Sequence, residues 1–490
     1  MWDLRRISTL TTVIVAVLLS GANANDLRDI LSSYGDIETV EIESTGQRFE
    51  HQQTITPGAP PRHASNYSLT MQWSPSTSHA SEKWQLDTVY PFPNSFTFSA
   101  DYSPNGGHRS GRDGFRPNSD GPVSVARVGA VLKDLWLSNP FLLMASADAA
   151  DLARIQNGAI ESITFDAHGT QWTVKFDKET HLPERMQTAE HDHLEGEVIN
   201  SVDFSDWRMI DEMPFPFRIE QKIDGNLIKR EVRSSISLNV ATIDVDASSS
   251  AAGADFDTAE MKRGWKNSHF YLRRAMLGAP SDGNEAAAVN INDLGGGIYQ
   301  IIGSSHHTIV VEGRKGLAIV DAAWYPRRSK AILAAIKKKW RKKPIKYIIL
   351  THHHIDHTGG LQPFAALGAT VVTSAENFKY FYDILAATQK SPPSMQAVNQ
   401  RLKLSGLGRD IDFFDIPNSH ANDMIGVYVP GVKMAINTDL YSPGLQAQQP
   451  VWAREFHDAI LFHGLDVEHH VGSHRNGTEP HQNLVNLFSN

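Results

Sequence analysis

The stretch Thr351-His352-His353-His354-Ile355-Asp356-His357-Thr358-Gly359-Gly360 decides the fold of this chain. It contains the pattern His-x-His-x-Asp-His, which puts four potential metal ligands within six residues. An apolar run, Ile345 to Leu350, precedes it and is typical of a buried strand. A loop at the end of a strand holds its side chains in a small volume, and imidazole and carboxylate groups suit zinc and similar divalent ions. The pattern therefore predicts a metal site. The alternative is a polar loop made rich in histidine by chance, in a chain with 22 histidines.

The composition is that of a folded protein with two domains of ordinary size. The chain has 490 residues, of which 41% are hydrophobic. Its formal net charge is −9, without a domain-wide basic excess, which argues against nucleic acid as the main partner. The chain contains no cysteine. This excludes disulfides, a lipid-modified N-terminal cysteine and any metal site with a cysteine ligand.

Residues 1–24 have the pattern of a secretory signal peptide. Arg5 and Arg6 form the positive end, Leu10 to Leu19 is a short apolar stretch, and Ala22-Asn23-Ala24 fits a cleavage site. The alternative, a membrane anchor, needs about 20 apolar residues, more than this stretch offers. We therefore expect a cleaved leader, no membrane span, and a periplasmic or secreted protein.

Residues 25–245 predict an antiparallel, β-rich N-terminal domain. Alternating or aromatic runs recur between turn signals such as His168-Gly169. We expect one helix between Val123 and Trp136. Ser103 to Pro122 is rich in Gly, Ser, Asn and Arg and predicts a long loop.

The run Asp203-Phe204-Ser205-Asp206-Trp207, followed by Pro214-Phe215-Pro216, resembles the curved half-barrel of periplasmic lipoprotein-carrier domains. The resemblance is weak and carries no catalytic constellation. It implies an envelope partner as one role for the N-terminal domain.

Two further segments follow the β-rich domain. Residues 246–285 are rich in Ala, Ser, Gly and Asp and predict a linker, with an amphipathic stretch at Phe270 to Leu277. Residues 286–490 predict a catalytic domain in which strands alternate with helices. The strands expected there are Ile298 to Ile302, Thr308 to Glu312, Leu317 to Val320, Ile345 to Leu350 and Thr370 to Thr373, and the helices are Ser329 to Trp340 and Leu361 to Leu367.

Five motifs in residues 289–489 resemble, in type and order, those of the metallo-β-lactamase-fold superfamily of metallohydrolases. They are Asp321 at a strand end, the His loop quoted above, His420 in Asn418-Ser419-His420-Ala421-Asn422-Asp423, Asp439 after Met434-Ala435-Ile436, and His474 in Val471-Gly472-Ser473-His474. Ala421 and Asn422 depart from the Thr or Ser and Gly that often follow the family's histidine. His469, His470 and His481 are the competitors of His474. The resemblance implies an α+β fold, the four-layer αββα sandwich.

The resemblance also implies a binuclear site, which we take to hold two Zn²⁺, although other divalent metals fit. One ion would be held by His352, His354 and His420, and the other by Asp356, His357 and His474. Asp439 would lie between the two ions at a spacing of about 3.5–4 Å. A hydroxide that bridges the metals would be the nucleophile, and Asp356 would orient it and take its proton. Asp321 would lie behind the ligands and orient the loop backbone or a ligand histidine.

Neighbouring side chains carry less specific predictions. Tyr441 could contact substrate and donate to a developing oxyanion, although a packed tyrosine is the more common case. His306 and His307 lie on an early hairpin that overhangs the site in members of the superfamily and could contact substrate, although ordinary strand-end histidines are the more common case. His353, the middle position of the pattern, should point away from the metals. Gly359 and Gly360 should allow close backbone packing.

We therefore predict a metal-dependent hydrolase that cleaves an ester, thioester, lactone or lactam bond in a small-molecule substrate. True β-lactamases usually lack a carboxylate at the place of Asp439, so this residue favours an esterase, lactonase, thioesterase or phosphodiesterase-like branch. A mononuclear iron enzyme similar to persulfide dioxygenases and a non-catalytic envelope binding protein are the alternatives. The full set of seven ligand candidates argues against both.

Overall fold

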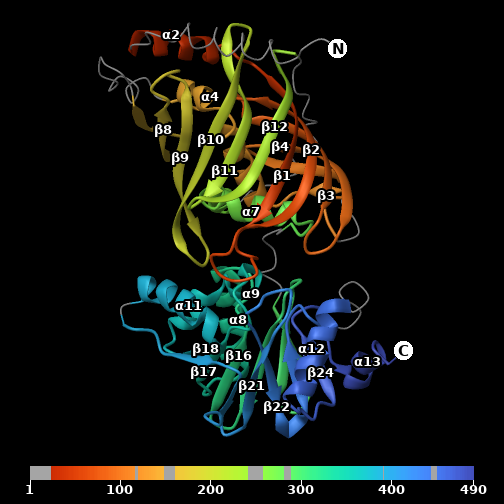
Figure 1. Cartoon of the computed structure of the whole chain (residues 1–490). Coiled ribbons are helices and arrows are strands. Elements are labelled where there is room, and N and C mark those ends of the chain that lie inside the picture. Colours follow the sequence, from red (N-terminus) through yellow and green to blue (C-terminus); the bar gives the residue numbers. More distant parts are fainter. Residues whose placement is uncertain are drawn as a thin grey trace. The chain divides into compact units, whose positions relative to one another are not determined.

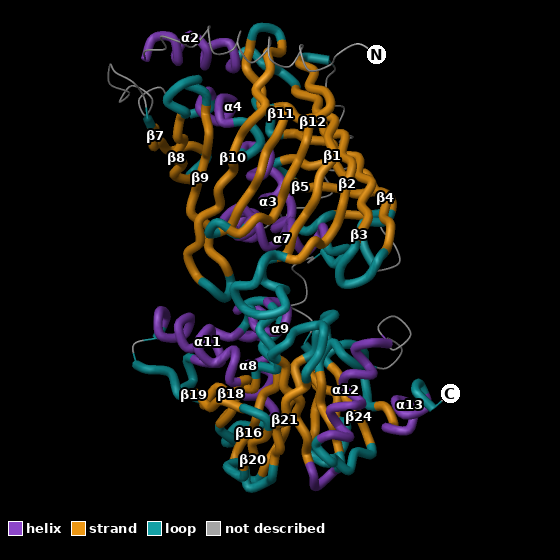
Figure 2. The backbone as a smooth tube through the Cα atoms, viewed as in Figure 1, coloured by secondary structure: helices purple, strands orange, loops and turns teal. Residues whose placement is uncertain are grey.

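The computed structural model describes residues 24–115, 120–147, 161–240, 258–280, 289–389, 391–442 and 450–489. Residues 1–23 of the expected leader lie outside the described residues. The chain divides into two compact units, each visible in Figure 1 and Figure 2. Unit 1 comprises residues 1–50, 61–192 and 197–283, and unit 2 comprises residues 51–60, 193–196 and 284–490. Two short segments from the first half of the sequence therefore belong to the second unit.

Unit 1 is built on one antiparallel sheet of 12 strands, which confirms the predicted β-rich domain. The spatial order is β6-β5-β4-β3-β2-β1-β12-β11-β10-β9-β8-β7, so the chain forms two meanders that meet where β1 pairs with β12. Side chains alternate between buried and exposed along strands such as β3 and β7, as expected for a sheet with one covered face. The strands are β1 (Val40–Glu50), β2 (Arg62–Ser74), β3 (His79–Thr88), β4 (Asn94–Ser103), β5 (Gly106–Gly111), β6 (Gly121–Pro122), β7 (Ser162–Ala167), β8 (Thr170–Phe176), β9 (Pro183–Asp192), β10 (Gly196–Ile210), β11 (Met213–Ile223) and β12 (Asn226–Leu238).

The helices of unit 1 are α2 (Ala24–Gly35), α3 (Val125–Trp136), α4 (Pro140–Ala145), α6 (Thr258–Lys266) and α7 (Ser268–Met276). The predicted helix at Val123 to Trp136 is α3, and it is buried along almost its whole length. Helix α6 crosses α3 so closely that a Cβ on Gly264 would lie 1.7 Å from the carbonyl oxygen of Ala126. Helix α7 also packs on α3.

Two expectations for unit 1 differ from the structure. Within the segment expected as a loop, Ser103 to Pro122, β5 pairs with β4 in a tight hairpin, because Gly106 has a φ of +146° and closes the turn. The segment expected as a linker, residues 246–285, contains α6 and α7 of unit 1 within its described residues, 258–280, and α7 covers most of the expected amphipathic stretch. Gly264 of α6 allows the close packing on α3.

A buried ionic network lies inside unit 1. The Lys133 ammonium of α3 is 2.8 Å from Glu190, and His269 Nδ1 of α7 is 2.6 Å from the same carboxylate. Ser268 donates a hydrogen bond of 2.6 Å to Glu190, and His269 Nε2 is 3.1 Å from Asp192. Burial raises the pKa of Glu190, but Lys133 and His269 outweigh it, and the net pKa lies far below its usual value. These contacts tie α3 and α7 to strand β9.

Unit 2 contains two sheets that face one another. The first has the order β13-β14-β15-β16-β17-β18-β19, and the second has the order β20-β21-β22-β23-β24-β25. Strands β16 to β19 run parallel, as do β23 and β24. The strands of the first sheet are β13 (Asn290–Asp293), β14 (Ile298–Ile302), β15 (Thr308–Gly313), β16 (Gly316–Val320), β17 (Ile345–Ile349), β18 (Thr370–Ser374) and β19 (Met395–Val398). Those of the second are β20 (Arg401–Leu404), β21 (Ile411–Ile416), β22 (Met424–Val429), β23 (Met434–Asn437), β24 (His469–Gly472) and β25 (Glu479–Pro480).

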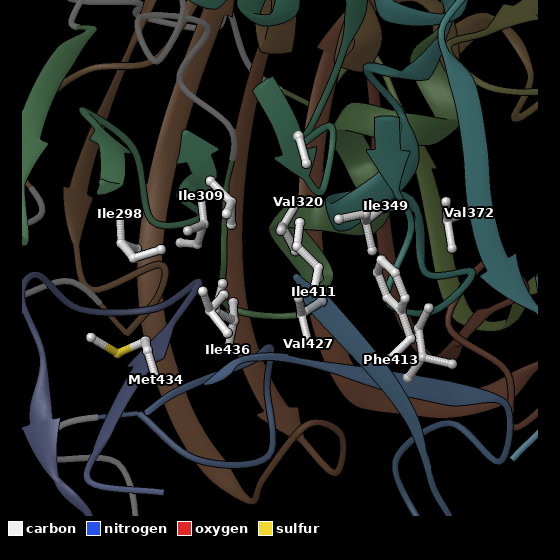
Figure 3. Close-up of a cluster of buried hydrophobic side chains, with 14 of the residues drawn as sticks. Ile298, Ile309, Val320, Ile349, Val372, Ile411, Phe413, Val427, Met434 and Ile436 are labelled. Carbon is white, nitrogen blue, oxygen red and sulfur yellow. The ribbon is translucent and has the colours of Figure 1, made fainter. Parts of the chain in front are cut away.

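The main core of unit 2 lies between its sheets (Figure 3). Ile309, Val320 and Ile349 of the first sheet pack in one cluster with Phe413 and Ile436 of the second. The next residue along β21, Phe414, belongs instead to a second cluster that includes helix α12, because successive side chains of a strand point to opposite faces. Each sheet of this unit therefore has two covered faces.

Helices complete the outer layers of unit 2. They are α8 (Pro326–Lys339), α9 (Ile355–Thr358), α10 (Leu361–Ala365), α11 (Ala375–Thr388), α12 (Pro450–Phe462) and α13 (His481–Asn486), with the 3-10 turn η3 (Pro430–Val432). Helix α11 contacts β18 and β19 of the first sheet, and α12 contacts β21 of the second. The predicted four-layer αββα sandwich is confirmed, and the strands expected from residue 298 to 373 begin and end within about one residue of those observed. Among the described helices of the whole chain, none has the length and apolar character that a bilayer crossing requires.

Candidate metal centre

The motif residues of unit 2 gather at the carboxyl ends of parallel strands. Asp321 follows β16, the His loop follows β17, Asp439 follows β23 and His474 follows β24. In sheets of this kind, the carboxyl ends of the strands form the edge where ligands bind. Asp321 and Asp439 both have a left-handed backbone, with φ values of +61° and +64°. Aspartate tolerates this conformation better than most residues, and it turns both side chains out of their strands.

Two groups of side chains in the described residues have the spacing of metal ligands. The first contains His352, His354, His420 and Asp439, and the second contains His306, His357, Asp439 and His474. Within each group, one ligand atom per residue lies within 4.8 Å of all the others. Asp439 is common to both groups.

The two oxygens of Asp439 face different histidines. Its Oδ2 is 2.9 Å from His420 Nε2 and 3.4 Å from His352 Nε2. Its Oδ1 is 3.0 Å from His357 Nε2 and 2.5 Å from His474 Nε2. Burial raises the pKa of Asp439, but His357 and His474 outweigh it and hold the net pKa well below its usual value. An ionised carboxylate between two histidine groups is the arrangement of a bridging ligand.

Three histidine rings of the His loop fit divalent metal ions, because one ring nitrogen is anchored and the other is left for a metal. His352 Nδ1 lies 3.1 Å from the Thr351 hydroxyl, and His357 Nδ1 lies 3.0 Å from Asp321. His352 Nε2, His357 Nε2 and His354 Nδ1 are buried without a partner in hydrogen-bond geometry among the described residues. Burial lowers the pKa of His354 well below its usual value, and His352 and His420 lower it further. This keeps the ring neutral, the form that binds metals.

Asp321 anchors the His loop from behind. Its carboxylate accepts hydrogen bonds of 3.0 Å from the backbone N–H and the hydroxyl of Thr351, and it lies 3.0 Å from His357 Nδ1. Asp321 is fully buried. It therefore fixes both the loop backbone and the ring orientation of one candidate ligand, as an outer partner of a metal site does.

His306 takes a place in the second group where the sequence analysis expected Asp356. His306 is 5% exposed, and its ring centroid is 4.3 Å from that of His474. Asp356 lies directly beside the group, with Oδ2 3.1 Å from His306 Nε2 and 2.8 Å from Gln53 Nε2. The interpretation of His306 as an ordinary strand-end histidine is therefore corrected, because the turn between β14 and β15 brings it to His357 and His474. His307 stays outside both groups.

Three other predicted positions have clear surroundings. The His353 ring turns away from both groups, toward Asp423 at 3.1 Å and the Thr54 hydroxyl at 3.2 Å. Tyr441 is 1% exposed and packs against the His470 ring at 5.4 Å, in the core beside α12. Of the two interpretations of Tyr441, a substrate contact and a packed core residue, its surroundings fit the second. A Cβ on Gly359 would lie 2.1 Å from the carbonyl oxygen of Trp324, so the close approach expected at this glycine is present.

Sequence reasoning missed the segment His51–Pro60. It lies between β1 and β2 in the chain but belongs to unit 2. Gln53 and Thr54 contact Asp356, His353 and His354. Their only signal in the sequence is a run of polar residues between two strands, which is also the signal of an ordinary hairpin loop.

Comparison with known proteins identifies the family of this region. Residues 301–471 match the family model described as the metallo-beta-lactamase superfamily. The chain is 24% identical over 149 residues to the 2,4-dinitroanisole O-demethylase subunit alpha of Nocardioides sp. (strain JS1661), which covers 30% of this chain and 45% of that protein. It is 34% identical over 87 residues to the linear primary-alkylsulfatase of Pseudomonas sp, which covers 17% of this chain and 13% of that protein.

A third relative is the metallo-beta-lactamase type 2 of Elizabethkingia meningoseptica, with 26% identity over 184 residues that cover 35% of this chain and 70% of that protein. The matches to the first two relatives span less than half of their length. The family model covers the His loop, His420 and Asp439, and it ends three residues before His474. These matches support the metallo-beta-lactamase superfamily for the C-terminal part of this chain, residues 301–471.

Proposed function

We propose that the protein is a two-zinc hydrolase that cleaves an ester, thioester, lactone or lactam bond in a small-molecule substrate. The observation that carries the proposal is the Asp439 carboxylate, which has histidines of one group at Oδ2 and histidines of the other at Oδ1. A lone metal ion would need only one of these groups. The signal-peptide pattern of residues 1–24 supports the periplasm or the cell exterior as the location of this activity.

Two bound zinc ions would supply a water activated as a nucleophile at neutral pH and an electrophile for the substrate oxygen. His352, His354 and His420 would hold one ion, and His306, His357 and His474 the other, with Asp439 shared. Asp356 lies beside the second group and faces His306 and Gln53 through Oδ2. In this proposal Asp356 orients the attacking water and accepts its proton.

The Trp452 ring forms an apolar wall beside the first group. Its centroid is 4.4 Å from that of His420, with the two ring planes inclined by 66°. Trp452 lies in the first turn of α12, and its side chain is half-buried. An apolar group of the substrate next to the scissile bond would pack on this ring.

The names of the relatives support cleavage of small molecules but differ in the bond. One is a lactamase, one an O-demethylase and one an alkylsulfatase. The mononuclear iron alternative requires one histidine group, and the binding-protein alternative requires neither. Retention of both groups around Asp439 favours the two-metal hydrolase over both alternatives.

The test combines metal content with turnover. The protein, purified without chelators, is analysed by elemental mass spectrometry and assayed with chromogenic esters, thioesters, lactones, phosphodiesters, alkyl sulfates and a cephalosporin. We expect two zinc ions per chain and hydrolysis within one class. One iron per chain would support the dioxygenase alternative, and no metal and no turnover after zinc addition would support the binding protein.

Two variants test the assignment of the ligands. His354→Ala and Asp439→Ala should abolish turnover, because each removes a ligand from a buried group, while circular dichroism should show the fold retained. Full activity in either variant would contradict the two-metal mechanism.

A further inference from the structure

The segment His51–Pro60, called the strap here, connects two long strands of unit 1 but is packed within unit 2. Gln52, Gln53 and Thr54 are 3%, 4% and 0% exposed. A hairpin loop with three consecutive buried polar residues is unusual, because polar side chains are normally buried only where they form hydrogen bonds. The strap therefore has specific partners.

The backbone of the strap contacts two of the loops that carry candidate ligands. The Gln52 carbonyl accepts a hydrogen bond of 3.2 Å from the N–H of Ile355, within the His loop. The Ile55 carbonyl accepts one of 2.9 Å from the N–H of Asn422, two residues after His420. The strap thereby links the His loop to the loop of His420.

The Thr54 carbonyl oxygen lies 2.9 Å from His354 Nε2. A carbonyl oxygen only accepts hydrogen bonds, so Nε2 carries the proton and donates it. The neutral ring then has its lone pair on Nδ1, the buried nitrogen that faces the first ligand group. The strap thus selects the tautomer in which His354 can bind a metal.

The Gln53 side chain donates a hydrogen bond of 2.8 Å from Nε2 to Asp356 Oδ2. The amide N–H points at one carboxylate oxygen and thereby orients the carboxylate. His306 Nε2 lies 3.1 Å from the same oxygen. Gln53 therefore fixes the direction of Asp356 relative to the second ligand group.

We propose that the strap positions the metal-binding groups of the C-terminal domain: Gln53 orients Asp356, and the Thr54 carbonyl sets the tautomer of His354. Gln53 is a positioning residue, since it acts through Asp356. A segment from the first half of the sequence thereby contributes to the metal centre of unit 2. This inference rests on the proposed metal-dependent function.

The first experiment uses the full chain with Gln53→Met, which keeps the length and volume of the side chain and removes its hydrogen bond. Zinc binding is measured by competition with a chromophoric chelator, and Co²⁺ binding by the visible spectrum, which reports the ligand field. We expect one of two ions to bind about 10–100-fold more weakly, the usual effect of losing an outer partner, with a changed Co²⁺ spectrum. The matched control is Ile55→Ala, whose side chain is 38% exposed and whose carbonyl contact is kept.

A second variant, Gln53→Asn, keeps the amide but shortens its reach, and should weaken the same ion by less than Gln53→Met. Wild-type zinc affinities and a wild-type Co²⁺ spectrum in Gln53→Met would overturn the assignment of Gln53.

The tautomer is tested on the wild-type protein, so that no variant needs to fold. Nitrogen-15 NMR of the histidine rings, with and without Zn²⁺, should show His354 protonated at Nε2 in both states. Protonation at Nδ1 would overturn the role of the Thr54 carbonyl. If wild-type protein binds neither Zn²⁺ nor Co²⁺, the proposed function fails as well, which distinguishes that outcome from a failure of the strap alone.

Discussion

At the scale of single residues, His306 is the difference between the observed ligand groups and the ligand set predicted from the sequence: it stands where Asp356 was expected. The histidine comes from the turn between β14 and β15, is buried, and lies within ligand distance of His357, Asp439 and His474. Burial lowers the pKa of His306 well below its usual value, and His474 lowers it further, so the ring is neutral. A neutral, buried imidazole beside an ionised carboxylate is available for a metal.

His306→Ala should therefore weaken one of the two zinc ions at least about tenfold, since a ligand matters no less than an outer partner. Chelator competition measures the two affinities. The control is His307→Ala, a neighbour equally exposed at 5% but outside both groups. Equal affinities in the two variants would exclude His306 from the site.

Only part of the candidate site could be predicted from the sequence. His352, His354 and His357 are recognisable because their spacing within one loop is itself the signal. His306 and Gln53 are not, because they reach the site only through folding: Gln53 and Asp356 are 303 residues apart. A histidine on a hairpin and a glutamine in a loop have no local pattern that distinguishes them from solvent-exposed residues.

At the scale of elements, helix α9 depends on a close backbone approach. Gly359 ends this helix with an ordinary helical φ of −59°, and a Cβ there would lie 2.1 Å from the Trp324 carbonyl oxygen and 2.8 Å from that of Ile355. Both obstacles are backbone atoms, which cannot rotate away. The helix carries Asp356 and His357, so a shift of α9 moves the site.

Gly359→Ala should destabilise unit 2 by about 1–3 kcal/mol, the usual cost of overpacking, and should also weaken zinc binding. Thermal unfolding and zinc titration measure the two effects. Gly431→Ala is the matched control, since nothing lies within 4 Å of its added Cβ. An unchanged melting temperature in Gly359→Ala would contradict the close packing of α9.

The elements of unit 2 were more predictable than those of unit 1. Strands such as β16 and β22 are continuous apolar runs, because both of their faces are covered. In unit 1, β5 reads Gly-Gly-His-Arg-Ser-Gly and lacks any apolar alternation, so only its pairing with β4 makes it a strand. Helices α6 and α7 were obscured by the small residues around them.

At the scale of the whole molecule, the two units should respond to different conditions. If zinc binds folded unit 2 alone, as we propose, it stabilises that unit by about 2.7 kcal/mol when free zinc is 100 times the dissociation constant. Removal of zinc with a chelator should lower the melting temperature of one calorimetric transition by about 5–10 °C and leave the other unchanged. A chelator that shifts neither transition would argue against a metal centre in unit 2.

Unit 1 should respond to acid through its buried network. The folded-state pKa of Glu190 lies below its ordinary value of 4.5, so the network stabilises the unit above that pH and the contribution is lost as the pH falls further. Lys133→Met leaves Glu190 with one cationic partner fewer in a fully buried position.

We expect Lys133→Met to cost about 3 kcal/mol at pH 7 and progressively less below about pH 4.5. Urea unfolding at pH 7 and at pH 3.5 measures both values. The control, Lys178→Met, removes a pair with Glu161 whose side chains are 75% and 70% exposed, and it should have no measurable effect. If Lys133→Met lowers the free energy of unfolding equally at both pH values, the loss comes from packing and the charge of Lys133 does not contribute.

The position of the strap also has a consequence in time. At about 5–20 residues per second, a ribosome needs about 15–60 s to travel from Gln53 to Asp356. Strands β1 and β2, which flank the strap, are made early and pair with each other, so the two ends of the strap are joined before His354 is synthesised. The contacts that bury the strap are made with residues of unit 2, so the Thr54 carbonyl becomes a fixed acceptor only when unit 2 folds around it. A circular permutation that encodes residues 284–490 first would let unit 2 be synthesised before the strap, and should slow the assembly of the centre.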